Sequence, residues 1–86
     1  ACSNFTAFPN PAENELNIRF FSEVDDEITF EVYDVIGKLI VNKSVSVARG
    51  NNLITLDISF VSGRVYTLKT KVPLMGIVTN QKFIKI

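Results

Sequence analysis

The chain of 86 residues is long enough for one hydrophobic core and too short for two, so we expect a single domain that folds alone. Hydrophobic residues make up 47% and charged residues 21% of the composition, which excludes a disordered chain, and no apolar run approaches the roughly 20 residues that span a bilayer. The formal net charge is zero, histidine is absent, and the lone cysteine, Cys2, excludes an internal disulfide and cannot by itself form a structural zinc site.

Cys2 has two interpretations. The commoner one is a small hydrophobic residue near a terminus, and the other is a lipid-modified cysteine, because Ala1-Cys2 fits the end of a lipoprotein signal. Residues 1–12 lack the basic segment and long apolar run of a secretory signal, so an export signal would have to lie upstream of Ala1 in a larger precursor.

Two prolines that flank a single residue open the folded part of the chain. Pro9 and Pro11 each lack an N–H group and fix φ near about −65°, so Phe8-Pro9-Asn10-Pro11 cannot lie inside a paired strand. The segment therefore predicts a rigid corner between strands. Residues 1–7 are expected to hold the end of a linker and the first strand of a domain that spans residues 1–86.

Strict alternation of apolar and polar residues predicts half-buried strands over residues 16–20 and 28–33. The polar and acidic link over residues 22–27 is expected to be a solvated hairpin loop. The tetrad Asp34-Val35-Ile36-Gly37 suits a tight turn, because it supplies an acceptor side chain first and a glycine last.

The second half of the chain continues with short strands. Residues 38–47 predict one strand, or two short ones bent near Lys43-Ser44, and Arg49-Gly50-Asn51-Asn52 is the clearest turn because Gly and Asn accept left-handed backbone angles. Residues 54–58 and 66–71 alternate, Pro73 and Gly76 bracket a loop, and residues 77–86 form a closing strand.

About seven short strands with turns at intervals of roughly 8 to 12 residues predict an all-β fold, an antiparallel β-sandwich. The apolar faces of these strands define the expected core: Leu16, Ile18, Phe20, Ile28, Phe30, Val32, Leu56, Tyr66 and Leu68.

Charge is distributed unevenly along the chain. Residues 1–37 hold one base and eight acids, a balance of −7, and residues 38–86 hold eight bases and one acid, a balance of +7. One interpretation is cross-strand pairing between early and late strands, worth a few tenths of a kcal/mol per pair, about 0.2–1 at most. The other is that the basic half meets an anionic partner.

The sequence lacks the residues of an active site, so we expect no enzyme and no cofactor. Without histidine the serines have no ordinary activating base, and the glycine-containing turns lack phosphate-loop spacing. Four acidic side chains lie in the 22–27 link: Glu23, Asp25, Asp26 and Glu27. The default interpretation is a solvated acidic turn. The alternative is a calcium site, although the spacing fits no calcium-loop motif. The aromatic residues fall on core faces, which argues against a nucleic-acid or sugar platform.

An ordered set of short motifs resembles a known family. The set comprises Phe8-Pro9-Asn10-Pro11, Leu16-Asn17-Ile18, Val32-Tyr33-Asp34-Val35-Ile36-Gly37-Lys38, a Gly-Asn-Asn turn, Gly63 with Tyr66, and the ending Lys82-Phe83-Ile84-Lys85-Ile86. Together these motifs resemble the C-terminal sorting domain of type IX secretion cargo in Bacteroidota. The resemblance covers about residues 5–86. One departure is that two residues, Arg64 and Val65, separate Gly63 from Tyr66 where the family commonly has one, which puts the local turn or bulge in question.

The resemblance implies an immunoglobulin-like β-sandwich that ends a larger exported protein. Such domains are recognised by the outer-membrane translocon and usually removed by a sortase-like cysteine peptidase, as the cargo reaches the cell surface or the extracellular space. The partners implied are this machinery and a fused N-terminal cargo domain, with no nucleic acid and no direct membrane insertion. The recognition residues implied are Pro9, Asn10, Pro11, Gly37, Lys38, Gly63, Tyr66, Lys82, Lys85 and Ile86.

Physical reasoning adds roles for these residues. The corner would fix the first strand, Gly37-Lys38 would turn the third strand into the fourth, and the last strand would present the exposed side chains of Lys82 and Lys85 with the Ile86 carboxylate. A mobile strand of this kind could add to an open sheet edge of a receptor. The competing function is a passive spacer or ligand-binding accessory module of a secreted enzyme, which would not need Ile86 to be the natural last residue of the precursor.

Overall fold

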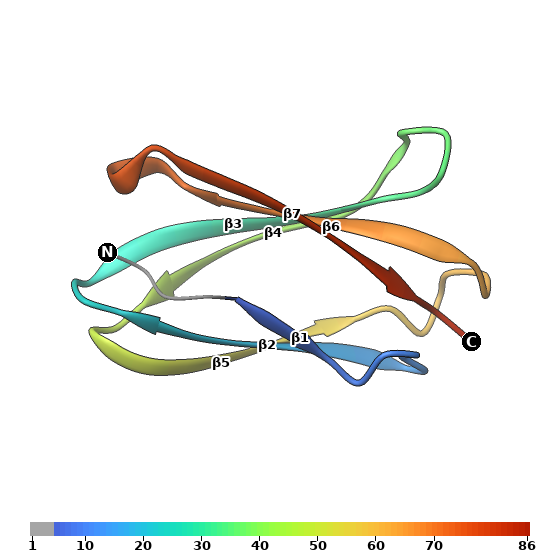
Figure 1. Ribbon diagram of the computed structural model, residues 1–86, viewed down its shortest axis with the longest axis horizontal. Helices are drawn as coiled ribbons and strands as arrows, with labels where there is room; N and C mark the ends of the chain where they lie inside the picture. Colours follow the sequence, from blue (N-terminus) through green and yellow to red (C-terminus); the bar gives the residue numbers. More distant parts are fainter. Residues whose placement is uncertain (1–4) are drawn as a thin grey trace.

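Two antiparallel sheets face each other in the computed structural model, which describes residues 5–86 (Figure 1). One sheet has three strands in the order β1-β2-β5, and the other has four in the order β4-β3-β6-β7. The elements are β1 (Thr6–Phe8), β2 (Glu15–Ser22), β3 (Asp26–Tyr33), β4 (Leu39–Val47), β5 (Gly50–Asp57), β6 (Val65–Val72), the 3-10 turn η1 (Pro73–Met75) and β7 (Ile77–Ile84). The predicted all-β antiparallel sandwich of about seven strands is confirmed. Among residues 5–86, no helix is long and apolar enough to cross a membrane.

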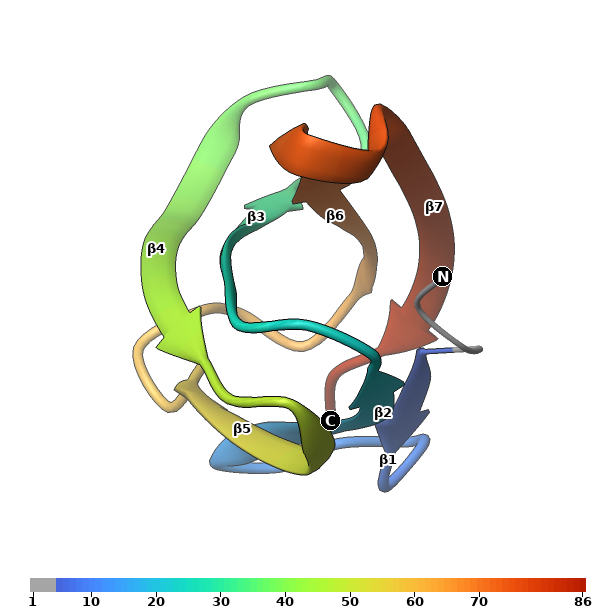
Figure 2. The same cartoon turned by 90° about the vertical axis from the view of Figure 1, so that its left-hand side faces the viewer.

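The core lies between the two layers, which Figure 2 shows end-on. All of the predicted core residues are buried, and the structure adds further buried members: Ala12, Val47, Ile58, Val72 and Phe83. Phe30 is fully buried, and its ring lies 6.3 Å from that of Phe20 between centroids. Each large apolar side chain buried in this way contributes about 1.5–3 kcal/mol to folding.

The link between β2 and β3 is not the predicted hairpin loop. β2 belongs to the three-stranded sheet and β3 to the four-stranded sheet, so the segment carries the chain across the sandwich. Ser22 is fully buried, and its hydroxyl donates a hydrogen bond to the Val24 carbonyl oxygen at 2.6 Å. The prediction was wrong because alternation shows which residues of a strand face the core but not in which sheet the strand lies.

The predicted Arg49–Asn52 turn is shifted for the same reason. β4 ends at Val47 and β5 begins at Gly50, so the chain crosses between the sheets at residues 48–49. Asn51 and Asn52 are strand residues, and the Asn52 amide donates to the Ala48 and Gly50 carbonyl oxygens. The asparagine thus stabilises the crossing from within the strand.

The β3–β4 turn is confirmed. Asp34 Oδ1 accepts the N–H groups of Ile36 and Lys38 at 3.0 and 2.9 Å, and Gly37 N–H donates to the Asp34 carbonyl oxygen. Gly37 has φ of 85°, a conformation that favours glycine. β4 is one strand, and its register irregularity lies opposite Val32 and Tyr33 and not near Lys43.

Candidate recognition site at one end of the sandwich

Segments far apart in the sequence meet at one end of the sandwich, which we call the motif end. It consists of residues 9–14, 34–38, 58–64 and 84–86, and it lies on the right in Figure 1. The structure brings most of the predicted recognition residues to this end: Pro9, Asn10, Pro11, Gly37, Lys38, Gly63, Tyr66, Lys85 and Ile86. Lys82 lies outside this end, earlier in β7, where it pairs with Thr67 of β6.

The proline corner holds the last residues of the chain. Asn10 Oδ1 accepts the Ile84 N–H at 3.0 Å, although the two residues are 74 positions apart. Ala12 N–H donates to the Ile84 carbonyl oxygen at 2.7 Å, and Ile86 N–H donates to the Ala12 carbonyl oxygen at 2.9 Å. We call this set of three bonds the terminal clamp. Its pairing is parallel, and no sequence signal could have revealed it, because the bonded atoms are mostly main-chain groups.

Gly63 allows the chain ending to pass close to the β5–β6 loop. A Cβ atom on Gly63 would lie 3.2 Å from the Lys85 carbonyl oxygen, and Lys85 N–H donates to the Arg64 carbonyl oxygen at 2.9 Å. The glycine therefore serves close approach rather than a left-handed turn. β6 begins at Val65, which pairs with Ile84, and the β6–β7 register runs from there without a shift. The extra residue after Gly63 thus lies in the loop and causes no bulge.

Tyr66 anchors the loop to the sheet. Its hydroxyl donates to the Ser62 carbonyl oxygen at 2.6 Å, and its ring stacks on Phe83 with centroids 5.8 Å apart. This arrangement resembles the tyrosine corner of immunoglobulin-like sandwiches. The side chain is 3% exposed, so Tyr66 shapes the motif end from inside.

The expectation that Lys85 is exposed was wrong, whereas Lys82 is exposed as expected. Alternation along β7 turns Gln81, Phe83 and Lys85 towards the protein and leaves Lys82, Ile84 and Ile86 outside. Lys85 is 9% exposed, and its Nζ donates to a main-chain oxygen of Ile86 at 2.8 Å. A lysine can be buried in this way because its aliphatic stem packs while the amine keeps a partner.

The terminal strand, which was expected to be available to a receptor sheet, is hydrogen-bonded on both sides over its last residues. β7 pairs with β6 along its whole length, and the terminal clamp bonds residues 84–86 on the other side. Adding this strand to a receptor sheet through residues 84–86 would require the clamp to open first.

An open hollow of about 420 Å³ lies between the β3–β4 turn and the β5–β6 loop. Its lining includes the charged side chains of Asp34, Lys38 and Arg64 and the apolar side chains of Leu39 and Phe60. The surroundings are unusually apolar for a surface, with these exposed side chains at or beside the motif end: Val35, Ile36, Leu39, Phe60, Val65, Ile84 and Ile86. The exposed residues in the loops were missed at the sequence level, because a single apolar loop residue carries no periodic signal.

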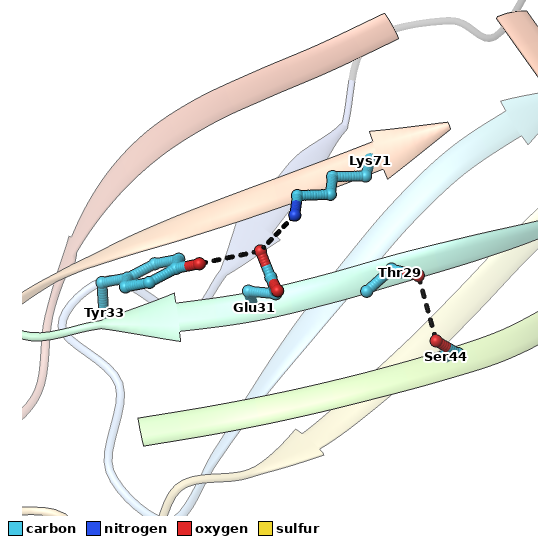
Figure 3. A network of polar contacts seen from close by, with 5 residues as sticks. All are labelled: Thr29, Glu31, Tyr33, Ser44 and Lys71. Carbon is cyan, nitrogen blue, oxygen red and sulfur yellow. Dashed lines mark hydrogen bonds and ion pairs between the residues drawn. The ribbon is translucent and has the colours of Figure 1, made fainter. Parts of the chain in front are cut away.

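A polar network lies on the outer face of the four-stranded sheet (Figure 3). Glu31 Oε1 accepts hydrogen bonds from Lys71 Nζ at 3.0 Å and from the Tyr33 hydroxyl at 2.9 Å. The bond from Lys71 lowers the pKa of Glu31, whereas the bond to Glu31 raises the pKa of both Lys71 and Tyr33. This pair joins an acid of residues 1–37 to a base of residues 38–86, as the cross-strand interpretation of the charges predicted.

The acidic residues named as a calcium alternative lie at the opposite end, which we call the acidic end: residues 23–27, 48–49 and 73–76. Asp25 Oδ1 accepts the Arg49 N–H at 2.9 Å, and Asp26 Oδ1 accepts the Glu27 N–H at 2.6 Å. Within residues 5–86, no three acidic or thiol side chains gather in a way that could hold a metal ion. Cys2 lies outside the described residues.

Comparisons with known proteins agree with this geometry. A family model described as the secretion system C-terminal sorting domain matches residues 6–85. The chain is similar to part of the crystal structure of dimeric latent PorU from Porphyromonas gingivalis, with a TM-score of 0.79 and 23% identity, over 95% of this chain and 9% of that one. The chain thus spans about a tenth of the length of PorU, and the likeness shows the fold. No curated protein matches the chain. Because the family model covers nearly all of the chain, this immunoglobulin-like β-sandwich belongs to the C-terminal sorting domain family of type IX secretion.

Proposed function

We propose that residues 1–86 form the sorting address of a larger precursor, which the outer-membrane translocon recognises after passage through the periplasm. A sortase-like cysteine peptidase then removes the domain as the cargo reaches the cell surface or the extracellular space. The observation that carries this proposal is the convergence of the family motifs at the motif end, where the proline corner, Gly63 and the ending of the chain contact one another.

The direction of the chain supports the same role. In β1, Thr6 pairs with Arg19 and Phe8 with Asn17, so β1 runs from the side of the acidic end towards the motif end. A cargo domain fused before β1 therefore joins the sandwich on the side of the acidic end. We expect this direction to place the cargo nearer the acidic end and to leave the motif end accessible to the machinery.

The domain acts as a substrate and an address, not as a catalyst. The chain has no histidine, and the buried carboxylate of Glu31 is engaged by Lys71 and Tyr33, which lowers its pKa and makes it a poor proton donor at neutral pH. We expect no turnover of esters, peptides, glycosides or phosphates. Elemental analysis of the purified domain is expected to find no stoichiometric zinc or calcium, and finding either would contradict this part of the proposal.

Export of a reporter tests the address. The chain is fused behind a Sec signal and a reporter in a Bacteroidota host with a type IX system, and surface reporter is compared with periplasmic reporter. We expect the full fusion at the surface and a fusion that lacks residues 77–86 in the periplasm. If the full fusion stays periplasmic, or if the truncated one is exported equally well, the domain is a spacer or accessory module and not an address.

A finer test concerns the basic side chains of β7. Lys82 is exposed, so Lys82→Ala should change stability by no more than about 0.5 kcal/mol. Lost export with unchanged melting would assign recognition to that charge. Lys85→Ala serves a different purpose, since it removes a buried side chain that bonds Ile86 and is expected to lower stability as well.

A further inference from the structure

The hollow at the motif end is lined by two basic side chains, Lys38 and Arg64, and one acidic side chain, Asp34, so its lining has a formal charge of +1. Lys38 and Arg64 are exposed, and within residues 5–86 neither side chain takes part in an ion pair or a hydrogen bond. The carboxylate of Asp34 accepts two main-chain N–H groups of its own turn through Oδ1 and forms no ion pair with either basic side chain, so Lys38 and Arg64 are free to bind an anionic group. The surface is therefore suited to an occupant with negative charge.

The same hollow offers an apolar contact. Phe60 is 66% exposed, and Leu39 at the start of β4 is 43% exposed. Phenylalanine and arginine are both enriched at protein interfaces, and both line this hollow as Phe60 and Arg64. An occupant that matches both the basic and the apolar side chains of the hollow has carboxylates on either side of at least one large apolar side chain.

Two groups of residues at the motif end have different tasks. Tyr66, Gly63 and the terminal clamp are buried or main-chain features that hold the loops in place. Phe60, Lys38 and Arg64 are exposed side chains carried by those loops. The first group thus fixes the positions of the loops, and the second group supplies the side chains that a partner can contact.

We propose that this hollow docks an acidic segment of a protein of the secretion machinery, with an apolar side chain of that segment against Phe60 and its carboxylates near Lys38 and Arg64. The inference rests on the proposed sorting function. The exposed apolar side chains of Leu39 and Phe60 in the lining favour a protein segment, which can supply an apolar side chain beside its carboxylates, over a lipid phosphate, which supplies charge alone. A second copy of the domain also exposes acids, among them Glu13 and Asp57, so self-association is one of the outcomes that the test distinguishes.

The test uses the reporter fusion with matched variants at the two ends. Phe60→Ser and Arg64→Glu alter the hollow, Leu74→Ser and Arg49→Glu make the same exchanges at the acidic end, and Arg64→Lys keeps the charge. We expect export to fall about tenfold or more for the two variants of the hollow and to stay within about twofold for the other three. All melting temperatures should agree within about 3 °C, because the changed side chains are exposed.

The outcomes separate this inference from the proposed function. If the unaltered fusion is not exported, the sorting function fails. If the unaltered fusion is exported but Phe60→Ser and Arg64→Glu are exported equally well, the sorting function stands and the docking surface fails. A fall of equal size at both ends also overturns the docking surface.

The nature of the occupant is tested directly. A photo-crosslinking amino acid at position 60 is expected to form an adduct within an acidic stretch of an outer-membrane protein that export requires, and the same amino acid at position 74 is not. Flotation with phosphatidylglycerol vesicles and sedimentation of the purified domain cover the other occupants. Vesicle binding or self-association that Arg64→Glu abolishes would overturn the proposal in favour of a lipid or a second copy.

Discussion

The two ends of the sandwich are built in different ways. The acidic end is closed by contacts made within or between neighbouring turns, such as the bond from Gly76 N–H to the Pro73 carbonyl oxygen. The motif end is closed by the terminal clamp, which joins segments 74 positions apart. The motif end also gathers exposed apolar side chains, whereas the acidic end exposes Val24 and Leu74. The end that depends on the whole fold is thus the one where the family motifs converge.

The substitution with the largest expected effect weakens the hydrophobic core, which supports both ends of the sandwich. Phe30 is fully buried between the sheets, so Phe30→Ala should lower the free energy of unfolding by about 3–5 kcal/mol through lost burial and a cavity. Urea unfolding followed by circular dichroism measures the effect. An unchanged unfolding midpoint would mean that this ring does not lie at the centre of the core.

A smaller change should separate the ends. Gly63→Ala places a Cβ atom 3.2 Å from the Lys85 carbonyl oxygen and should cost about 1–3 kcal/mol, because the chain ending must shift. Hydrogen exchange should increase at the Ala12, Ile84 and Ile86 amides and stay unchanged at the Arg49 amide. Leu74→Ala at the acidic end is the control, with an expected change within about 0.5 kcal/mol.

Removing one hydroxyl should sharpen the comparison further. Tyr66→Phe deletes the hydrogen bond to the Ser62 carbonyl oxygen while leaving the ring stacked on Phe83. We expect a loss of about 0.5–1.5 kcal/mol, with faster exchange in the 58–64 loop than at the acidic end. Equal exchange at the two ends would show that the hydroxyl does not fix the loop.

The smallest expected effect is a dependence of the unfolding free energy on pH, which arises from the Glu31–Lys71 pair on the four-stranded sheet and not from either end of the sandwich. The bond from Lys71 lowers the pKa of Glu31 below 4.5, so this contribution to stability is present above pH 4.5 and is lost as the pH falls through the folded-state value. The raised pKa values of Lys71 and Tyr33 put the alkaline loss above pH 10. Unfolding free energies from pH 3 to 7 should depend less on pH in Glu31→Gln than in the unaltered domain, and parallel curves would contradict the pairing.

The sequence could predict the local features because they depend on neighbouring residues. Alternation identified the core faces of β2, β3 and β6, and Asp34 with Gly37 indicated the β3–β4 turn. The alternation pattern could not predict which of the two sheets a strand joins, so the β2–β3 link was wrongly expected to be a hairpin. Which side chains of β7 face the protein depends on the register of β7 with β6, and the sequence does not show this register. The burial of Lys85 was therefore missed. The hollow was missed because it arises only when two loops meet.

The terminal clamp makes the motif end the last part of the domain that can be completed during synthesis. A ribosome produces Asn10 long before Ile84, so the proline corner cannot form the clamp until residues 84–86 have emerged. Contacts this distant in sequence form late, after the intervening chain has been made and ordered. A domain truncated before residue 84 would keep the proline corner but lose the residues that bind it. A partner that binds the motif end would therefore distinguish the completed domain from a truncated or incompletely folded one.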